Sequence, residues 1–172
     1  MNRLKFTLKA WPVIAAATIG LCFLTQAAAK LFGVDLPDQA QVEFVRRHAG
    51  WNLAFAFIVA QVAVLVPVLE EALFRWLMWR LPAALAGGAA AVPAAVASSA
   101  LFSFAHYVDY AALVSRRTFA LTGWNSAFLA LFFFGLAQCR LYRKTGRIWC
   151  PMLNHALFNL TNLILMFVVP EA

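Results

Sequence analysis

The sequence predicts an all-α integral membrane protein, a polytopic helical bundle of about five transmembrane helices with short interfacial helices. Of its 172 residues, 64% are hydrophobic and only 12% are charged, and the mean hydropathy is +0.78. Several uncharged runs approach or exceed the ~20 residues that a helix needs to cross a bilayer. A soluble apolar bundle of this size rarely has such a composition. We therefore expect residues 1–172 to form a single transmembrane domain.

The first apolar run covers residues 10–29 and follows a short basic segment. It carries no charge, so it can span the membrane as a helix. Its end, Ala27-Ala28-Ala29, resembles a signal-peptidase site, and a cleaved signal peptide is therefore the alternative. Residues 30–50 are more polar, and we expect a short interfacial helix after Pro37. His48 is interpreted as a solvated loop histidine.

Four more apolar runs follow, at residues 51–80, 83–110, 124–141 and 148–169. The first part of the run at 83–110 is rich in Ala, Gly and Ser, and such small residues let membrane helices approach closely. Pro93 in this stretch is expected to begin or kink the helix, because proline lacks a backbone N–H. No internal repeat or heptad pattern accompanies these runs.

The basic residues lie between the apolar runs and predict the orientation. The formal net charge is +7, which in a soluble protein would indicate a nucleic-acid partner. No nucleic-acid motif is present, and membrane topology with anionic lipid headgroups explains the charge more simply. With the N-terminus inside, the inner segments hold nine Lys and Arg residues against five outside. The sequence therefore predicts a cytoplasmic N-terminus and no nucleic-acid partner.

The three cysteines predict buried free thiols. Cys22, Cys139 and Cys150 each lie in or beside an apolar run. Their number is odd, and they form neither a disulfide framework nor a CxxC metal pattern.

The run at 51–80 contains two adjacent glutamates, Glu70 and Glu71, and then Arg75. An ionisable residue inside a membrane span is costly and is a functional candidate by default. Glu71 and Arg75 are four residues apart and can form an ion pair along one helix face. Glu70 has no such local partner. If it faces a water-filled pocket, it is suited to act as a general base.

The segment FSFAHY places Phe102 and His106 four residues apart, so the aromatic ring and the imidazole share one helix face. A satisfied core histidine is the structural alternative. A helix that begins near Pro93 would bring His106 to the depth of Glu70. A helix that begins at Leu81 would place it near the outer surface instead.

The segment WCPMLNHALFN places His155 and Asn159 four residues apart on one helix face, while Asn154 points elsewhere. Pro151 suits the first turn of this helix. A histidine and an asparagine together offer two donors for a developing oxyanion. The structural alternative is a polar clamp between helices.

Three motifs thus occur in order: EExxxR at Glu70, Glu71 and Arg75, FxxxH at Phe102 and His106, and HxxxN at His155 and Asn159. In this pattern the chain resembles the CAAX protease and bacteriocin-processing (CPBP, or Abi) family of intramembrane endopeptidases. The lead-in YRKTGRIWCPMLNHALFN is also similar to that of the family. The resemblance covers roughly residues 52–165, which we interpret as a protease core.

The resemblance implies proteolysis of a membrane-associated protein or peptide substrate. Glu70 and His106 would activate a water, and His155 and Asn159 would stabilise the oxyanion, with Glu71, Arg75 and Phe102 in support. Members are often labelled metalloproteases, and Glu70, His106 and His155 are the three residues that would bind Zn²⁺ with an open position. HExxH is absent, however, and we favour a mechanism without a metal or other cofactor.

Small bacterial members of the family trim leader peptides, remove C-terminal sorting tails or confer immunity to bacteriocins, so the bacterial inner (plasma) membrane is the expected location. The first hypothesis is an intramembrane endopeptidase of CAAX-type, leader-peptide or sorting-tail substrates. The second is a non-catalytic bacteriocin-immunity or partner-binding membrane protein that uses the same residues as a polar network. A proton- or ion-coupled transporter is a third, although the chain lacks repeated halves and broken helices.

Overall fold

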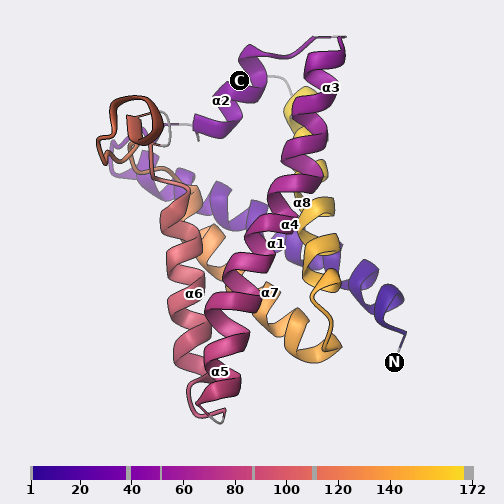
Figure 1. Cartoon of the computed structure of the whole chain (residues 1–172). Coiled ribbons are helices and arrows are strands. Elements are labelled where there is room, and N and C mark those ends of the chain that lie inside the picture. The colour runs from indigo at the N-terminus through magenta and orange to yellow at the C-terminus, as the bar shows by residue number, and fades with distance from the viewer. Residues whose placement is uncertain (1, 38–39, 51, 87, 110–111, 169–172) are drawn as a thin grey trace.

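The computed structural model describes residues 2–37, 40–50, 52–86, 88–109 and 112–168. These residues form helices and connecting turns, with one isolated antiparallel bridge between Val108 and Leu121 and no strand (Figure 1). The predicted all-α membrane fold is therefore confirmed.

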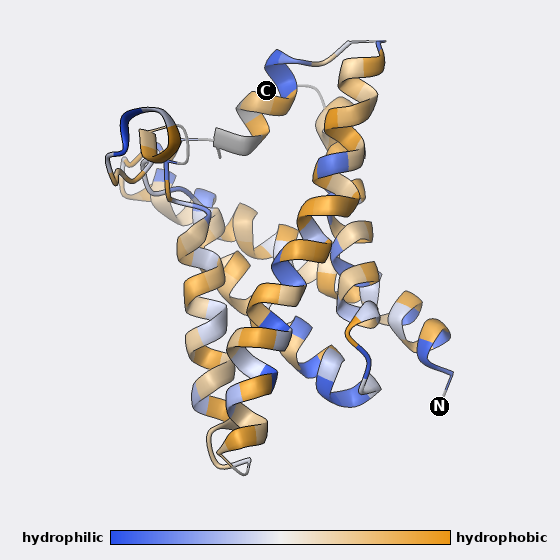
Figure 2. Cartoon of the chain, in the orientation of Figure 1, coloured by the Kyte–Doolittle hydropathy of each residue, from blue (hydrophilic) through white to orange (hydrophobic). Residues whose placement is uncertain are grey.

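Three helical segments in the described part are long and apolar enough to cross a membrane: Arg3–Leu31 (α1), Leu53–Leu85 and Trp149–Val168 (α8). Hydrophobic residues cover most of their length, and hydrophilic ones collect at helix ends and at a few places within the bundle (Figure 2). Helix α6 (Ala91–Ala105) is apolar but shorter, with 15 residues, and α7 (Ala127–Thr145) has 19. A helical segment overlaps each of the five apolar runs, and two short helices, α2 (Ala40–Arg47) and η3 (Ala112–Arg116), lie outside them. The number of crossings stays a prediction.

The helix ends follow local sequence signals. Asn2 caps α1, because its side-chain oxygen accepts a hydrogen bond from the backbone N–H of Lys5. Helix α6 begins at Ala91, which places Pro93 in its first turn. Gly146 ends α7 in the left-handed conformation, with φ of +66°. The prediction that the third apolar helix starts near Pro93 is confirmed, so His106 lies directly after the end of α6.

The segment from 53 to 85 is continuous but not uniformly α-helical. It consists of α3 (Leu53–Ala60), η1 (Gln61–Leu65), α4 (Val66–Glu70), η2 (Glu71–Arg80) and α5 (Leu81–Leu85). The stretches η1 and η2 are π-helical. For example, the N–H of Leu81 donates to the carbonyl of Trp76, five residues back. Pro67 and Pro82 follow η1 and η2 within two residues, and neither can donate a backbone hydrogen bond, which disturbs the regular ladder there.

The bundle packs around an aromatic core between α6, α7, α8 and η2. Helix α1 runs obliquely across α7 and α8 (Figure 1). Helices α6 and α7 approach closely, because a Cβ at Gly135 would lie only 2.9 Å from Cβ and Oγ of Ser99. This is the close packing that small residues in the 83–110 run predicted. The core residues are Ala15, Phe74, Phe102, Ala127, Leu131, Phe134 and Phe158.

The polar stretch between the first two long helices contains α2 (Ala40–Arg47), the expected short helix. His48 after it is exposed, as predicted. Cys22, Cys139 and Cys150 are free thiols, and the last two are buried.

Candidate active site

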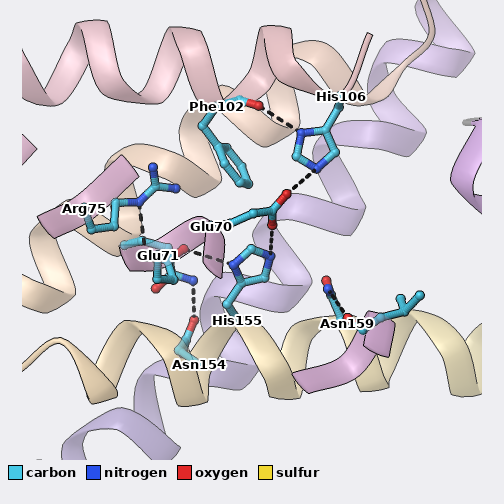
Figure 3. Close-up of polar contacts among 10 residues, drawn as sticks. Glu70, Glu71, Arg75, Phe102, His106, Asn154, His155 and Asn159 are labelled. Atoms are coloured by element: carbon cyan, nitrogen blue, oxygen red, sulfur yellow. Dashed lines mark hydrogen bonds and ion pairs between the residues drawn. The ribbon is translucent and has the colours of Figure 1, made fainter. Parts of the chain in front are cut away.

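Glu70, the last residue of α4, lies between His106, which directly follows α6, and His155 of α8 (Figure 3). Its Oε1 is 3.9 Å from Nε2 of His106, and its Oε2 is 3.6 Å from Nε2 of His155. The Glu70 side chain is 22% exposed, so it is half-buried at the wall of a cavity. The structure therefore brings together the three ionisable residues that the three motifs supplied separately.

Glu71 points into the protein and contacts two partners. Its Oε2 is 3.3 Å from Nε of Arg75, and its Oε1 is 2.9 Å from Nδ1 of His155. Glu71 and Arg75 are both fully buried. The predicted ion pair between them is confirmed. The contact with His155 was not anticipated, because it joins residues 84 positions apart.

Both glutamates thus contact one imidazole, at its two different nitrogens (Figure 3). On a regular α-helix, neighbouring side chains diverge by about 100°. The π-helical stretch that starts at Glu71 contains more residues per turn and reduces this divergence. Glu70 and Glu71 still face different surroundings, one the cavity and the other the core.

Phe102 supports the site with both its backbone and its ring. Its carbonyl oxygen accepts a hydrogen bond of 2.9 Å from Nδ1 of His106, which leaves Nε2 facing Glu70. Its ring centroid lies 4.5 Å from Cζ of Arg75 and 5.8 Å from the ring of His155. The guanidinium of Arg75 is therefore held between the Glu71 carboxylate and an aromatic face.

Asn159 lines the same cavity one helical turn beyond His155. Its Nδ2 donates a hydrogen bond of 2.9 Å to the carbonyl oxygen of Val62, in η1. The amide is therefore fixed by the π-helical segment, although it does not contact Glu70. A primary amide has two N–H groups, so the second one is available to another acceptor.

A second polar pair lies behind the site and was missed by the sequence analysis. Nε2 of Gln138, on α7, donates to Oδ1 of Asn154 at 2.9 Å, and both side chains are fully buried. Asn154 points away from the cavity, as predicted. The sequence signal for Gln138 was that an uncharged amide lies inside an apolar run. No local partner there indicates that this amide is paired.

The cavity beside Glu70 has a volume of about 730 Å³. Glu70, His106, His155 and Asn159 line one part of it. Helices α1 and α2 contribute further walls, including Cys22 and Arg46. Sequence analysis could not place these two helices at the site, because neither carries one of its motifs.

No group of three or more His, Cys, Asp or Glu side chains within the described ranges is arranged to hold a metal ion. The donor set of Glu70, His106 and His155 has the right chemistry for zinc, but it lacks ligand geometry as it stands.

Fold and site together define a polytopic helical membrane protein whose ionisable residues converge on an internal cavity. The chain matches the family model "Type II CAAX prenyl endopeptidase Rce1-like" over residues 48–161, which is about two thirds of its length. It therefore belongs to this family, and the resemblance drawn from the three motifs is confirmed. A search of curated proteins and a search of solved structures each found no match. The family makes the chain a membrane protease of the CAAX type, with a membrane-associated peptide as the class of substrate.

Proposed function

We propose that the chain is an intramembrane endopeptidase in which Glu70, assisted by His106, activates the hydrolytic water. The observation that carries this proposal is the meeting of Glu70 with two imidazole Nε2 atoms at the wall of a large cavity. A carboxylate and an imidazole within reach of one water are the groups that general-base hydrolysis needs.

The tautomers support a water between these groups. His106 donates its Nδ1–H to a carbonyl oxygen, which cannot donate in return, so its neutral ring presents a lone pair at Nε2. Glu70 lies 3.9 Å from that atom, which is too long for a direct hydrogen bond. At such a distance a bridging water satisfies both acceptors. Glu70 takes one proton from this water, and the hydroxide attacks the peptide carbonyl carbon.

His155 and Asn159 would stabilise the oxyanion of the tetrahedral intermediate. His155 donates its Nδ1–H to the Glu71 carboxylate at 2.9 Å, which orients the ring, and a proton on the other ring nitrogen, Nε2, would then be donated to the oxyanion. Asn159 adds its second N–H. When the C–N bond breaks, the proton held by Glu70 passes to the leaving amine, which restores the carboxylate.

The charges of the site support proton transfer between Glu70 and the histidines. Glu71 and Arg75 neutralise each other in the core. This leaves Glu70 and the two imidazoles as the groups of the site that can exchange a proton. A proton that moves among these three groups keeps the net charge of the site constant, which matters because a low-dielectric interior penalises changes in charge.

We favour this metal-free mechanism over a zinc-dependent one. If zinc bound, Glu70, His106 and His155 would hold it, and the metal would supply a more acidic water. Metal analysis of the purified protein and activity after chelation distinguish the two. The metal-free mechanism requires full activity without a stoichiometric metal.

The basic residues support a cytoplasmic N-terminus, with nine Lys and Arg residues inside against five outside. We propose this orientation in a bacterial inner membrane. Reporter fusions at the two ends of α1 test it, and reporter activity that places the N-terminus outside would overturn it.

The decisive experiment compares the N-terminal peptides of membrane fractions from cells with wild-type protein, with Glu70→Gln, with Asp35→Asn, or without the protein. Asp35 is an exposed carboxylate outside the cavity, so its change to the amide is the matched control. We expect one precursor to accumulate in the Glu70→Gln and deletion cells only, and that precursor identifies the substrate. If Glu70→Gln matches wild type while the deletion differs, the chain acts without this chemistry, as an immunity or partner-binding protein.

A further inference from the structure

A second, smaller hollow lies at the end of the bundle where α5 turns into α6 and α7 turns into α8. It has a volume of about 280 Å³, and its walls include Trp79, Arg80, Gly88, Tyr142, Arg143 and Gly146. It shares no lining residue with the cavity beside Glu70. We call it the basic crevice.

The walls of the basic crevice are fixed by contacts within the bundle. Nε1 of Trp79 donates a hydrogen bond of 2.9 Å to the carbonyl oxygen of Ala91, at the start of α6. The Trp79 and Tyr142 rings meet edge to face, with centroids 5.6 Å apart. Gly88 and Gly146 have φ of +82° and +66°, and a Cβ on either would meet open space. These contacts hold the walls of the hollow in place.

The crevice is strongly positive. Arg80 and Arg143 are exposed, and neither guanidinium has a hydrogen bond or ion pair within the described residues. The sequence has no Asp or Glu between positions 71 and 109 or between 109 and 171, and the crevice is built from these two segments. Hydrophilic residues gather at the end of α7 (Figure 2), where Arg140 and Lys144 add further charge.

We propose that the basic crevice binds the phosphate of an anionic lipid headgroup. Guanidinium groups bind phosphate oxygens with two parallel hydrogen bonds, which suits Arg80 and Arg143. Trp and Tyr are the side chains that favour the depth of lipid headgroups. Basic pockets between transmembrane helices are a known setting for such headgroups.

Exposed apolar residues within two positions of the lining residues Arg80, Ala83 and Ala91 favour a lipid over a soluble anion. Leu81 and Leu85 of α5 are 40% and 80% exposed, and Val92 of α6 is 66% exposed. These apolar side chains need acyl chains as neighbours, whereas a site for a soluble anion would open to water through a polar rim. A lipid matches both the basic crevice and the exposed apolar side chains, with its phosphate in the crevice and its acyl tails along the helices.

Native mass spectrometry of the full chain in a neutral detergent tests the proposal. The probes are phosphatidylglycerol, phosphatidylcholine and inorganic phosphate. The test variant is Arg80→Gln with Arg143→Gln, and the control is Arg140→Gln with Lys144→Gln, which removes two exposed charges of the same end from outside the crevice. Arg143→Gln alone serves as a milder variant, because this side chain makes no contact that the fold requires.

We expect phosphatidylglycerol to bind the wild type more tightly than phosphatidylcholine. The test variant should lose about 30-fold in affinity, and the control less than about fivefold. Equal losses in the two double variants, or no loss in the test variant and in Arg143→Gln, would overturn the proposal. Displacement of the lipid by inorganic phosphate at similar concentration would identify a soluble anion instead. Lipid binding is read without any substrate, so the result does not depend on the proposed proteolysis.

Discussion

The replacement of Glu71 by glutamine tests the division of labour between the two adjacent glutamates. Glu71→Gln keeps the size of the side chain and an acceptor for Nδ1 of His155, but it removes the charge that balances Arg75. The guanidinium, which is fully buried, would then retain the rings of Phe102, 4.5 Å away, and Phe74, 5.9 Å away, but no carboxylate partner. Glu70→Gln makes the same chemical change at a cavity wall, so it is the matched control.

The loss in the free energy of unfolding should be large for Glu71→Gln and small for Glu70→Gln. Removal of one partner of a buried ion pair costs about 3–5 kcal/mol, because the other charge stays buried without compensation. This corresponds to about two to four powers of ten in the unfolding equilibrium. The Glu70 carboxylate is 22% exposed and not at hydrogen-bond distance from either histidine, so its replacement should cost about 1 kcal/mol or less.

Reversible unfolding in mixed micelles, followed by tryptophan fluorescence, measures both values. The double variant Glu71→Gln with Arg75→Met removes both charges, and an apolar side chain in place of a buried charge is often tolerated. It should recover at least about 2 kcal/mol relative to Glu71→Gln. Two results would show that the buried pair does not have the role assigned to it. Glu71→Gln could be as stable as Glu70→Gln, or the double variant could lose the sum of what Glu71→Gln and Arg75→Met lose when each is measured alone.

Two further predictions concern helix packing and the oxyanion. Gly135→Ala should destabilise the fold by about 1–3 kcal/mol, because its Cβ would lie 3.1 Å from the backbone of Ser99. The Cβ of Gly20→Ala meets open space, so this variant should be neutral or stabilising by up to about 1 kcal/mol. Equal effects of the two variants in the unfolding assay would contradict this prediction. Asn159→Ala should lower kcat by about 10²–10³ with little change in KM, because the amide acts on the transition state. A purely structural bond from Asn159 to Val62 would instead reduce stability and leave kcat of the folded fraction unchanged.

Much of the architecture was accessible from the sequence because bilayer-spanning helices need long uncharged runs. A helical segment overlaps each of the five runs, the short helix α2 follows Pro37, and α6 begins two residues before Pro93. The π-helical stretches were not predicted. They depend on how a continuous segment with two prolines packs against its neighbours. The pattern of apolar residues in the sequence does not reveal a turn that contains one extra residue.

The sequence by itself determined which residues could form the site, since charged and imidazole groups are too costly in apolar helices to occur there without a purpose. It also determined the Glu71–Arg75 pair, because residues four apart meet on the helix that contains them. Only the tertiary structure decided that Glu71 also contacts His155, that Gln138 pairs with Asn154, and that α1 and α2 wall the cavity. These contacts join residues on different helices, and their distances depend on how the helices cross, which no local spacing specifies.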